Sequence, residues 1–379
     1  MSWPEAWYRL RDRWLANAGF QQWATRFALT RPIARHHARQ TFDLCAGFIY
    51  SQIVLACVQL RLLELLREGP QPAAQLASRC GLSEAAMQRL LCAAATLDLC
   101  RARGRAKSGD CFGLGFQGAL LLGNPALIAM IEHHALLYAD LADPVALLRG
   151  EGQPTRLQAF WSYAGAAPGS TPDNDRARQY SRLMSSTQAL VGAAVLDACD
   201  MSRHHRLLDI GGGDGTFLLA ATQRAPRLEG VLFDLPAVCE LAATRFQRSA
   251  AVGRLTVHPG DFRCDSLPGG ADIVSLVRVL HDHDDTAVLD LLRSVRAAIA
   301  PSGRLLIAEP LRATQGAQRM GDAYFGFYLL AMGQGRPRSI EEIATLLEAG
   351  GFGRPRELSS ALPLQTRVLV ASPSSVNKH

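Results

Sequence analysis

The sequence lacks the signatures of a secreted, membrane-spanning or zinc-bound protein. None of its nine cysteines forms a C-x-x-C pair and most have apolar helical neighbours. This excludes a zinc site or a disulfide framework and predicts reduced core thiols. No apolar run reaches the length of a membrane span, and the polar N-terminus has no apolar signal segment. Repeats and low-complexity tracts are also absent. Because the thiols are expected to be reduced, we expect a cytoplasmic protein.

The positive charge of the chain is concentrated at its N-terminus. The 379 residues carry a net charge of +6, and residues 1–40 contain seven arginines against Glu5 and Asp12. The same segment, here called the N-terminal arm, holds four of the five tryptophans: Trp3, Trp7, Trp14 and Trp23. Arginine mixed with tryptophan suits a membrane interface, and it equally suits a helix that packs on a partner subunit. Both interpretations stay open, and no nucleic-acid partner is expected.

Residues 206–217, R-L-L-D-I-G-G-G-D-G-T-F, carry the most informative pattern. A short apolar strand runs into a glycine cluster, and a helix-like segment follows at once. Glycine there permits positive φ and a close approach to a ligand. Asp209, Gly211, Gly213 and Gly215 give D-x-G-x-G-x-G, which departs from the G-x-G-x-x-G of dinucleotide sites. The pattern resembles the S-adenosylmethionine (SAM) loop of class I methyltransferases.

Further apolar strands follow this loop. We expect six further strands, which with the strand before the glycine cluster make a seven-stranded sheet. They lie near residues 230–234, 255–258, 272–277, 304–308, 356–361 and 366–371. Such strands are typical of a parallel sheet that helices cover on both faces. Ligands bind at the carboxyl ends of these strands, where the sequence places Asp209, Asp234, Asp261, His281 and Glu309. We therefore predict an α/β, Rossmann-like domain that binds SAM.

His281 is the candidate catalytic base. It follows the fourth strand, where the methyl donor would lie, and a histidine with an ordinary pKa of about 6.5 accepts protons at neutral pH. Methyl transfer needs a nucleophilic acceptor oxygen, which a base provides by removing its proton. We expect Asp282 or Glu309 to orient the imidazole. The run H-D-H-D-D lacks the spacing of a metal site, so no metal is expected.

Residues 41–170 are predicted to form a mostly helical domain of winged-helix shape. We expect a long helical stretch, two short helices and a β wing at residues 41–67, 72–79, 83–99 and 100–114. This shape can bind DNA, but the second short helix offers only Gln88 and Arg89 as base readers and is otherwise typical of a packing helix. A loop at 165–175 marks the predicted boundary with the SAM domain, residues 171–379.

Six motifs, in order along the chain, resemble those of the plant-type O-methyltransferase family. They are L-L-D-I-G-G-G-D-G (207–215), F-D-L-P (233–236), G-D-F (260–262), V-L-H-D (279–282), A-E-P (308–310) and G-R-P-R-S (335–339). The resemblance covers residues 41–373. It implies an N-terminal winged-helix domain that forms a homodimer, a C-terminal SAM domain, and SAM as the methyl donor without a metal.

The resemblance also implies roles for single residues. Asp234 would hold the ribose of SAM, Asp261 and Phe262 would frame its adenine, and His281 would be the base with Glu309 beside it. The other residues assigned to the cofactor site are Asp209, Gly211, Gly213, Gly215, Leu235 and Arg278.

Two positions depart from the family pattern. His283 replaces the tryptophan that usually follows H-D. Pro337 stands where plant members place a second acid beside the base. We therefore do not expect two acids to orient the imidazole of His281.

Within the family, the chain resembles the bacterial O-methyltransferases of acyclic carotenoids, of the demethylspheroidene or hydroxyneurosporene type. The resemblance lies in the N-terminal arm and in F-W-S-Y (160–163), Y-S-R-L-M-S-S-T-Q-A-L (180–190) and A-Y-F-G-F-Y-L-L-A-M (323–332). The resemblance implies that the last three segments line an apolar acceptor pocket, although their residues equally suit a helix core. The pocket residues would be Phe160, Trp161, Met184, Tyr324, Phe325, Tyr328 and Met332. The implied reaction is methylation of a tertiary 1-hydroxyl in carotenoid biosynthesis, at the cytoplasmic face of a photosynthetic membrane.

Two other functions stay open. The acceptor could be a polyketide phenol or a chlorin whose metal recruits His133, His134 or His283. Alternatively, the chain could be a winged-helix regulator that senses SAM without catalysis. A sensor needs no base beside the sulfonium, so His281 favours an enzyme.

Overall fold

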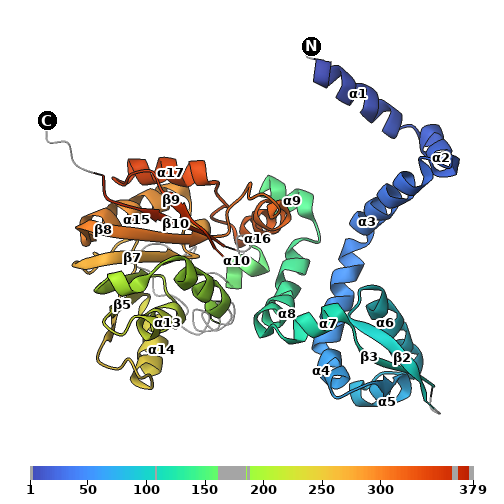
Figure 1. Ribbon diagram of the computed structural model, residues 1–379, viewed down its shortest axis with the longest axis horizontal. Helices are drawn as coiled ribbons and strands as arrows, with labels where there is room; N and C mark the ends of the chain where they lie inside the picture. Colours follow the sequence, from blue (N-terminus) through green and yellow to red (C-terminus); the bar gives the residue numbers. More distant parts are fainter. Residues whose placement is uncertain (1–2, 107–108, 161–184, 186–187, 361–365, 375–379) are drawn as a thin grey trace. The chain divides into compact units, whose positions relative to one another are not determined.

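The computed structural model describes residues 3–106, 109–160, 185, 188–360 and 366–374. The chain packs as two compact units that divide between Asn124 and Pro125 (Figure 1). The loop at 165–175, where the sequence places a domain boundary, lies outside the described residues. Helix α3 (Arg31–Gln59) runs without a break through residue 40, where the predicted N-terminal arm ends.

The first unit is a helical domain with a three-stranded wing. Its helices and strands are α1 (Trp3–Leu15), α2 (Ala18–Arg26), α3, α4 (Leu62–Arg67), β1 (Gln71–Pro72), α5 (Ala73–Cys80), α6 (Glu84–Thr96), β2 (Cys100–Ala106), β3 (Gly109–Leu114) and α7 (Phe116–Leu122). The antiparallel wing has the order β1-β3-β2. Leu62, Leu76, Leu91 and Phe112 share one buried core, because α4, α5 and α6 turn their apolar faces toward the wing. The predicted helix-turn-helix and wing are confirmed.

The helical stretch expected at 41–67 is divided at Arg61. This residue has a φ of 52°, between the end of α3 and the start of α4. Positive φ is uncommon for a residue with a side chain, and here it redirects the chain. The turn lets Leu62, Leu63 and Leu66 enter the core, which a straight continuation of α3 would not do.

Helix α3 is longer than predicted and more apolar than the sequence analysis allowed. By length and composition it could cross a membrane, and 22% of its most apolar window is buried. The expectation that no run has this length is therefore wrong. Isolated polar residues such as Asp43 interrupt the apolar run in the sequence without ending the helix. Phe42, Leu44, Phe48 and Ile49 are exposed on its surface.

The second unit holds the predicted α/β domain. Its helical segments are α8 (Pro125–Asp140), α9 (Pro144–Arg149), α10 (Arg156–Phe160), a helix at Gln188–Ala198, η1 (Met201–Arg203), α13 (Thr216–Arg224), α14 (Pro236–Gln247), η2 (Leu280–Asp282), α15 (Asp285–Ala298), η3 (Arg319–Tyr324), α16 (Phe325–Met332) and α17 (Ile340–Ala349). Its strands are β4 (Arg206–Ile210), β5 (Glu229–Asp234), β6 (Leu255–Pro259), β7 (Ala271–Val277), β8 (Ile299–Glu309), β9 (Arg356–Leu358) and β10 (Arg367–Ala371).

The seven strands form one sheet in the order β6-β5-β4-β7-β8-β10-β9. The first five run parallel, while β10 is antiparallel to both β8 and β9. Strand order reverses at β4, whose neighbours are β5 and β7. The carboxyl ends of β4, β5, β7 and β8 therefore meet at one edge, the usual place for a ligand in such a sheet.

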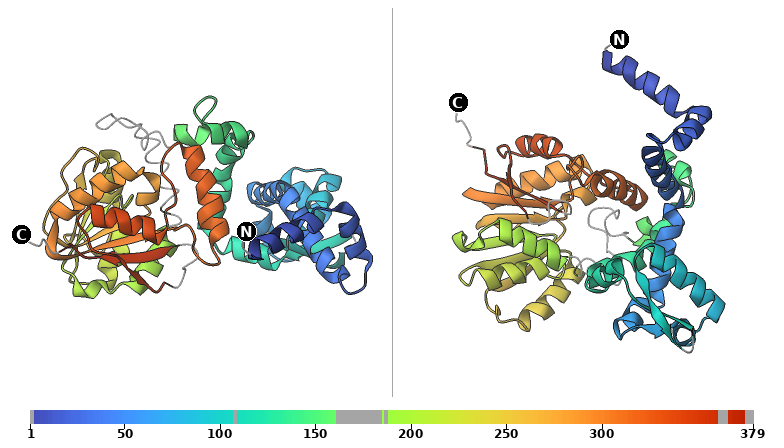
Figure 2. Two further views of the ribbon diagram at one scale, coloured as in Figure 1. Left: turned by 90° about the horizontal axis from the view of Figure 1, so that it is seen from above. Right: turned by 45° about the vertical axis from the view of Figure 1, so that its right-hand side comes forward.

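Helices cover both faces of this sheet, as predicted. Helices α15 and α17 pack on one face, while α13, α14 and the helix Gln188–Ala198 pack on the other (Figures 1 and 2). Adjacent residues of β4 show the alternation, because Leu208 enters the first core and Leu207 the second. The two buried layers fix the strand ends that carry the candidate site.

All nine cysteines are free thiols. Cys57, Cys100 and Cys239 are buried, in agreement with the sequence analysis. The expectation of core thiols is wrong for the three exposed ones, Cys45, Cys92 and Cys264. Apolar neighbours in the sequence do not show which face of a helix a cysteine occupies.

Candidate active site

The glycine-rich loop between β4 and α13 has a backbone that glycine adopts readily. Gly211, Gly213 and Gly215 have φ values of 67°, 64° and 77°. A Cβ on Gly215 would lie 2.4 Å from the ring of Phe246, whereas a Cβ on Gly213 would meet nothing within 4 Å. The loop therefore packs tightly on one side and is open at Gly213, which fits the close approach of a ligand to its backbone.

Asp209, at the end of β4, is buried and only partly satisfied. The hydroxyl of Ser275 donates to its Oδ1 at 2.6 Å. Its Oδ2 accepts no hydrogen bond from the part of the chain that the structure describes. Burial raises the pKa of Asp209 to about 7, the nearby Asp234 adds to the rise, and Ser275 opposes it. Because a buried acceptor without a donor is costly, a donor-bearing ligand beside this loop would stabilise the site.

Asp234, at the end of β5, is held by two backbone groups. The N–H of Gly213 donates to its Oδ2 at 2.8 Å, and the N–H of Leu235 donates to its Oδ1 at 2.7 Å. Burial raises the pKa of this carboxyl to about 6. Each oxygen keeps a free lone pair, so the carboxylate can accept hydrogen bonds from two neighbouring hydroxyls. Asp234 thus fits the ribose of SAM, and the glycine-rich loop fits the part of SAM that would lie against it.

The two residues expected to frame the adenine, Asp261 and Phe262, differ in how far other side chains already occupy them. Both oxygens of Asp261 pair with the guanidinium of Arg263, the closest contact being 2.7 Å. The ring of Phe262 meets the ring of His283 edge to face at 5.1 Å. Burial lowers the pKa of His283 to about 4, so its imidazole is neutral. Phe262 and His283 form an uncharged aromatic corner, while Asp261 is occupied by Arg263.

His281 lies between two carboxylates. Its Nδ1 is hydrogen-bonded to Oε2 of Glu309, and its Nε2 is 3.1 Å from Oδ1 of Asp282. Glu309 is itself fixed, because its Oε1 accepts the N–H groups of Val279 and Leu280 at 2.9 and 2.7 Å. The expectation that two acids do not orient His281 is wrong. Asp282 supplies the second carboxylate from the neighbouring position in the chain.

This arrangement sets the protonation of His281. Burial lowers the pKa of the imidazole, but Asp282 and Glu309 together outweigh this and raise it above its ordinary value of 6.5. A carboxylate at Nδ1 favours the tautomer that carries its proton there. When His281 is neutral, Nε2 is therefore the atom that can accept a proton.

The backbone before His281 is strained. Arg278 has a φ of 60°, and its N–H donates to the carbonyl of Ala308 at 2.8 Å. This turn leads from β7 into η2, which carries His281 and Asp282. A side-chain-bearing residue in the left-handed region persists only where its surroundings fix it. Arg278 thereby sets the direction in which the segment with His281 leaves the sheet.

The G-R-P-R-S turn supports the segment that carries His281. The guanidinium of Arg338 is 2% exposed and donates to the carbonyls of Leu280 and His283 at 2.6 and 2.7 Å. It also donates to Oδ1 of Asp285 at 2.7 Å. One arginine thus joins both ends of η2 to the start of α15. This role was not predicted, since a motif does not show which carbonyls an arginine reaches.

Gly335 and Arg336 hold the middle of the same segment. The N–H of Arg336 donates to the carbonyl of His281 at 2.9 Å. Gly335 has a φ of 76°, and a Cβ there would lie 2.2 Å from the same carbonyl oxygen. The first residue of the motif must therefore be glycine for the turn to pack against the backbone of His281.

Aromatic rings lie next to His281. The ring of Phe325 meets the imidazole at 5.8 Å, and Tyr324 meets Phe325 at 5.2 Å. Tyr324 also stacks on Tyr328 at 5.9 Å. The structure thus brings three of the predicted acceptor residues together in one row that begins at His281.

The other predicted acceptor residues do not belong to this row. Met332 is buried in a cluster with Leu157, and Phe160 packs against that cluster. Met332 therefore serves the core of this region. Trp161 and Met184 lie outside the described residues.

Two histidines of α8 cap the tyrosines of this row. Nε2 of His133 is 2.8 Å from the hydroxyl of Tyr328, and Nε2 of His134 is 2.7 Å from the hydroxyl of Tyr324. Burial lowers the pKa of His133 to about 4 and also lowers that of His134. The tyrosine hydroxyls are therefore satisfied by neutral partners, and the row adds no charge beside His281.

Two protein-family models match the two parts of this chain. The model of the O-methyltransferase domain matches residues 138–353, and the model of the O-methyltransferase dimerisation domain matches residues 42–123. The dimerisation match covers most of the first unit, and the catalytic match covers the glycine loop, His281 and Glu309. The dimerisation domain supports assembly into a homo-oligomer.

Similar proteins span nearly the whole chain. Demethylspheroidene O-methyltransferase from Cereibacter sphaeroides is 45% identical, over 91% of this chain and 89% of its own. The enzyme of that name from Rhodobacter capsulatus is 40% identical, over 91% and 85%. The solved structure of mitomycin 7-O-methyltransferase has a TM-score of 0.76 and 28% identity, over 90% of this chain and 100% of its own. The chain therefore belongs to the O-methyltransferase family and is a SAM-dependent O-methyltransferase.

Proposed function

We propose that the protein methylates the tertiary 1-hydroxyl of an acyclic carotenoid, in carotenoid biosynthesis. The observation that carries this proposal is the 45% and 40% identity to two demethylspheroidene O-methyltransferases over 91% of the chain. The aromatic row beside His281 supports it, because uncharged rings suit a long apolar acceptor.

Residues at the carboxyl ends of β4 and β5 would hold SAM. Asp234 would accept the ribose hydroxyls, and the backbone at Gly213 would approach the cofactor closely. The unsatisfied oxygen of Asp209 would gain a donor or a cationic partner. Bound SAM supplies an electrophilic methyl group on a sulfonium. Phe262 and His283 would contact the adenine with uncharged rings, as aromatic surfaces do with bases.

His281 would act as the general base. Glu309 holds Nδ1, which leaves Nε2 for the acceptor hydroxyl. Asp282 faces the same nitrogen at 3.1 Å, so the hydroxyl has to approach beside this carboxylate. Once the imidazole has taken the proton, Asp282 and Glu309 stabilise its positive charge, as carboxylates do in other base–carboxylate pairs.

A tertiary alcohol constrains the timing of proton transfer. It is far less acidic than a phenol, so neutral His281 does not form an alkoxide in advance. Proton removal would be concerted with methyl transfer, and much of the rate would come from orientation and exclusion of water. The fixed triad of Glu309, His281 and Asp282 suits this requirement, because it positions the base before the acceptor arrives.

A chlorin acceptor is less well supported. Ligation of its metal would need a free histidine nitrogen, but Nε2 of both His133 and His134 is engaged by a tyrosine hydroxyl. His283 is buried against Phe262. None of the three offers a ready ligand.

The proposal includes a cytoplasmic homodimer that associates with a membrane surface through the N-terminal arm. Trp7, Trp14 and Trp23 are at least half exposed. Trp14 and Trp23 each contact Phe20, at 5.5 and 5.7 Å, and arginines accompany them along α1 and α2. Exposed indoles beside cations suit the headgroup region, and an arm there would bring the enzyme to a lipophilic acceptor.

The test is transfer of labelled methyl from SAM by the full-length protein to detergent-dispersed acceptors. The acceptors are a 1-hydroxy acyclic carotenoid, a chlorin and a simple catechol. Label on the carotenoid alone supports the proposal. SAM binding with label on none of the three, or on the chlorin or catechol only, contradicts the proposed acceptor and leaves the enzyme class unaffected.

A further inference from the structure

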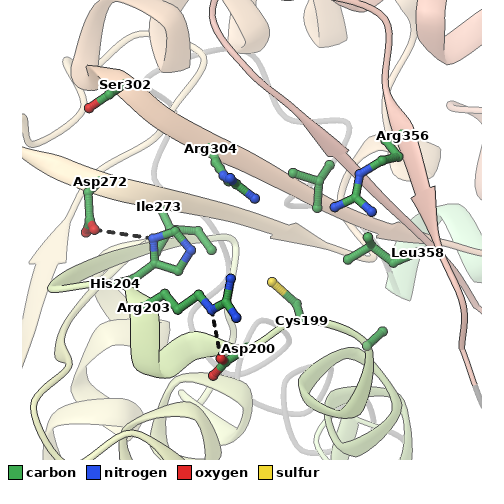
Figure 3. Close-up of a pocket in the computed structure, with 12 residues that line it drawn as sticks. Cys199, Asp200, Arg203, His204, Asp272, Ile273, Ser302, Arg304, Arg356 and Leu358 are labelled. Carbon is green, nitrogen blue, oxygen red and sulfur yellow. Dashed lines mark hydrogen bonds and ion pairs between the residues drawn. The ribbon is translucent and has the colours of Figure 1, made fainter.

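A pocket of about 440 Å³ lies away from the carboxyl-end edge of the sheet (Figure 3). Cys199, Arg203, Asp272, Ile273, Arg304 and Arg356 are among its lining residues. Arg304 precedes Glu309 on β8 by five residues, which corresponds to about 16 Å along a strand. The pocket is thus separate from the candidate active site.

The strand register places two arginines on one face of the sheet. Arg356 pairs with Val370, and Val370 pairs with Leu306, so these three side chains lie in one row across β9, β10 and β8. Arg304 is two residues before Leu306 and therefore points to the same side. Ile273, the β7 partner of Arg304, also lines the pocket. Both arginines consequently project from fixed strand positions.

Three guanidinium groups converge on this space. Figure 3 shows the side chains of Arg203, Arg304 and Arg356 pointing toward one another across the pocket, with the thiol of Cys199 between them. Arg203 is paired with Asp200 at 3.2 Å. Arg304 and Arg356 make no hydrogen bond or ion pair with any residue that the structure describes. Like charges that converge in a hollow are the usual sign of an anion site.

The other carboxylate of the pocket does not neutralise them. Asp272 accepts the N–H groups of His205 and Arg206 at 3.0 and 2.7 Å, and its Oδ2 is 3.3 Å from Nδ1 of His204. Asp272 is therefore engaged in holding the start of β4. The pocket keeps two positive charges without a described acceptor.

We propose that this pocket binds a phosphate ester. Guanidinium groups bind phosphate oxygens through paired hydrogen bonds, and two free arginines match the charge of a phosphate monoester, which is near −2. Ile273, Leu358 and Val370 give the pocket an apolar side, which suits the organic part of an ester. The source can be a soluble ester or the headgroup of an acidic lipid, since both present the same group.

The test measures binding by the full-length protein, with phenyl phosphate and inorganic phosphate as soluble probes in calorimetry. Sedimentation with vesicles of phosphatidylglycerol, compared with phosphatidylcholine, tests the lipid source. The variants are Arg304→Gln and Arg356→Gln. Arg354→Gln is the matched control, because Arg354 precedes the same strand, is 77% exposed and lies outside the pocket. Both pocket arginines are exposed, so their replacement leaves the fold intact, which a thermal melt checks.

We expect one saturable site for phenyl phosphate, tighter than for inorganic phosphate, and weakened about tenfold or more by either pocket variant. If the ligand is lipid, both variants also bind phosphatidylglycerol vesicles more weakly than the wild type does, and only the binding through the N-terminal arm remains. If it is a soluble ester, vesicle binding is unchanged while phenyl phosphate binding falls. Absence of saturable phenyl phosphate binding, or an equal loss in Arg354→Gln, overturns the proposal.

Discussion

The guanidinium of Arg338 donates a hydrogen bond to the carbonyl of Leu280, the residue before the candidate base His281, at 2.6 Å. It donates equally to the carbonyl of His283, on the other side of the base. His281 therefore lies in the middle of a short segment whose two ends are held by one buried side chain. Positioning of His281 depends on a residue 57 positions later in the chain.

Replacement of this arginine should destabilise the protein and slow catalysis together. In Arg338→Met, the buried carbonyl of Leu280 and the partly buried carbonyl of His283 lose their donor, which costs about 3 kcal/mol of unfolding free energy. Turnover should fall with it, because η2 is no longer fixed. Arg336→Met is the control, since Arg336 also contacts Asp285 but is 40% exposed. Chemical denaturation and kcat test both effects, and similar losses in the two variants would contradict the proposed role of Arg338.

Gly335→Ala tests the contact between the G-R-P-R-S turn and the base more finely. The new Cβ would lie 2.2 Å from the carbonyl oxygen of His281, so the turn and η2 must separate. A displacement of this kind near the reacting groups costs about tenfold to a hundredfold in kcat. Gly47→Ala is the control, because a Cβ there meets nothing within 4 Å. Unchanged kcat in Gly335→Ala would show that the position of His281 tolerates movement of the turn.

His281→Ala should reduce turnover far more than SAM affinity. Loss of a general base costs about a hundredfold to ten-thousandfold in rate, while His281 is not among the residues expected to hold the cofactor. Glu309→Gln should give a smaller loss of kcat, since it keeps the size of the side chain but not its charge. Calorimetric titration with SAM, beside initial rates, separates the two effects. A fall in SAM binding that matches the fall in rate would indicate a structural role for His281.

Asp234→Asn tests the predicted ribose site. The amide keeps the shape of the carboxylate but removes its charge, and its NH2 group cannot accept the hydrogen bond from one of the two backbone N–H groups, that of Gly213 or that of Leu235. Loss of charge-assisted hydrogen bonds should weaken SAM binding by about tenfold to a hundredfold. Glu229→Gln removes an exposed acid from the same strand and serves as the control. Equal affinity of the wild type and Asp234→Asn would place the ribose elsewhere.

The sequence predicted what local patterns determine. The sheet, and the edge of it that carries the site, were predicted from apolar runs that are followed by acidic residues. This was possible because the hydrophobic pattern of a strand and the residues at its end lie within a few positions of each other. The glycine loop was predictable for the same reason. The division of the first long helix at Arg61 was not, since a left-handed arginine follows from packing in the core.

Contacts between distant segments were also beyond local patterns. The bond between Arg338 and Leu280 spans 58 positions, and no spacing rule connects them. Asp282 is adjacent to His281, yet only the 3₁₀ geometry of η2 shows that its carboxylate folds back onto Nε2. Such contacts decide the protonation of His281.

The pH dependence of methyl transfer should report the two carboxylates beside His281. Only neutral His281 accepts a proton, so the rate rises as pH increases through the pKa of the imidazole. Asp282 and Glu309 raise that pKa above 6.5 despite burial, which places the acid limb of the profile above this value. In Asp282→Asn, His281 loses one of the two negative charges that raise its pKa, while burial still lowers it. The acid limb of the profile should therefore move to lower pH. The maximal rate should also fall. Asp290→Asn, which alters an exposed acid on α15, should leave the limb in place. An unchanged limb in Asp282→Asn would mean that another group limits the rate at low pH.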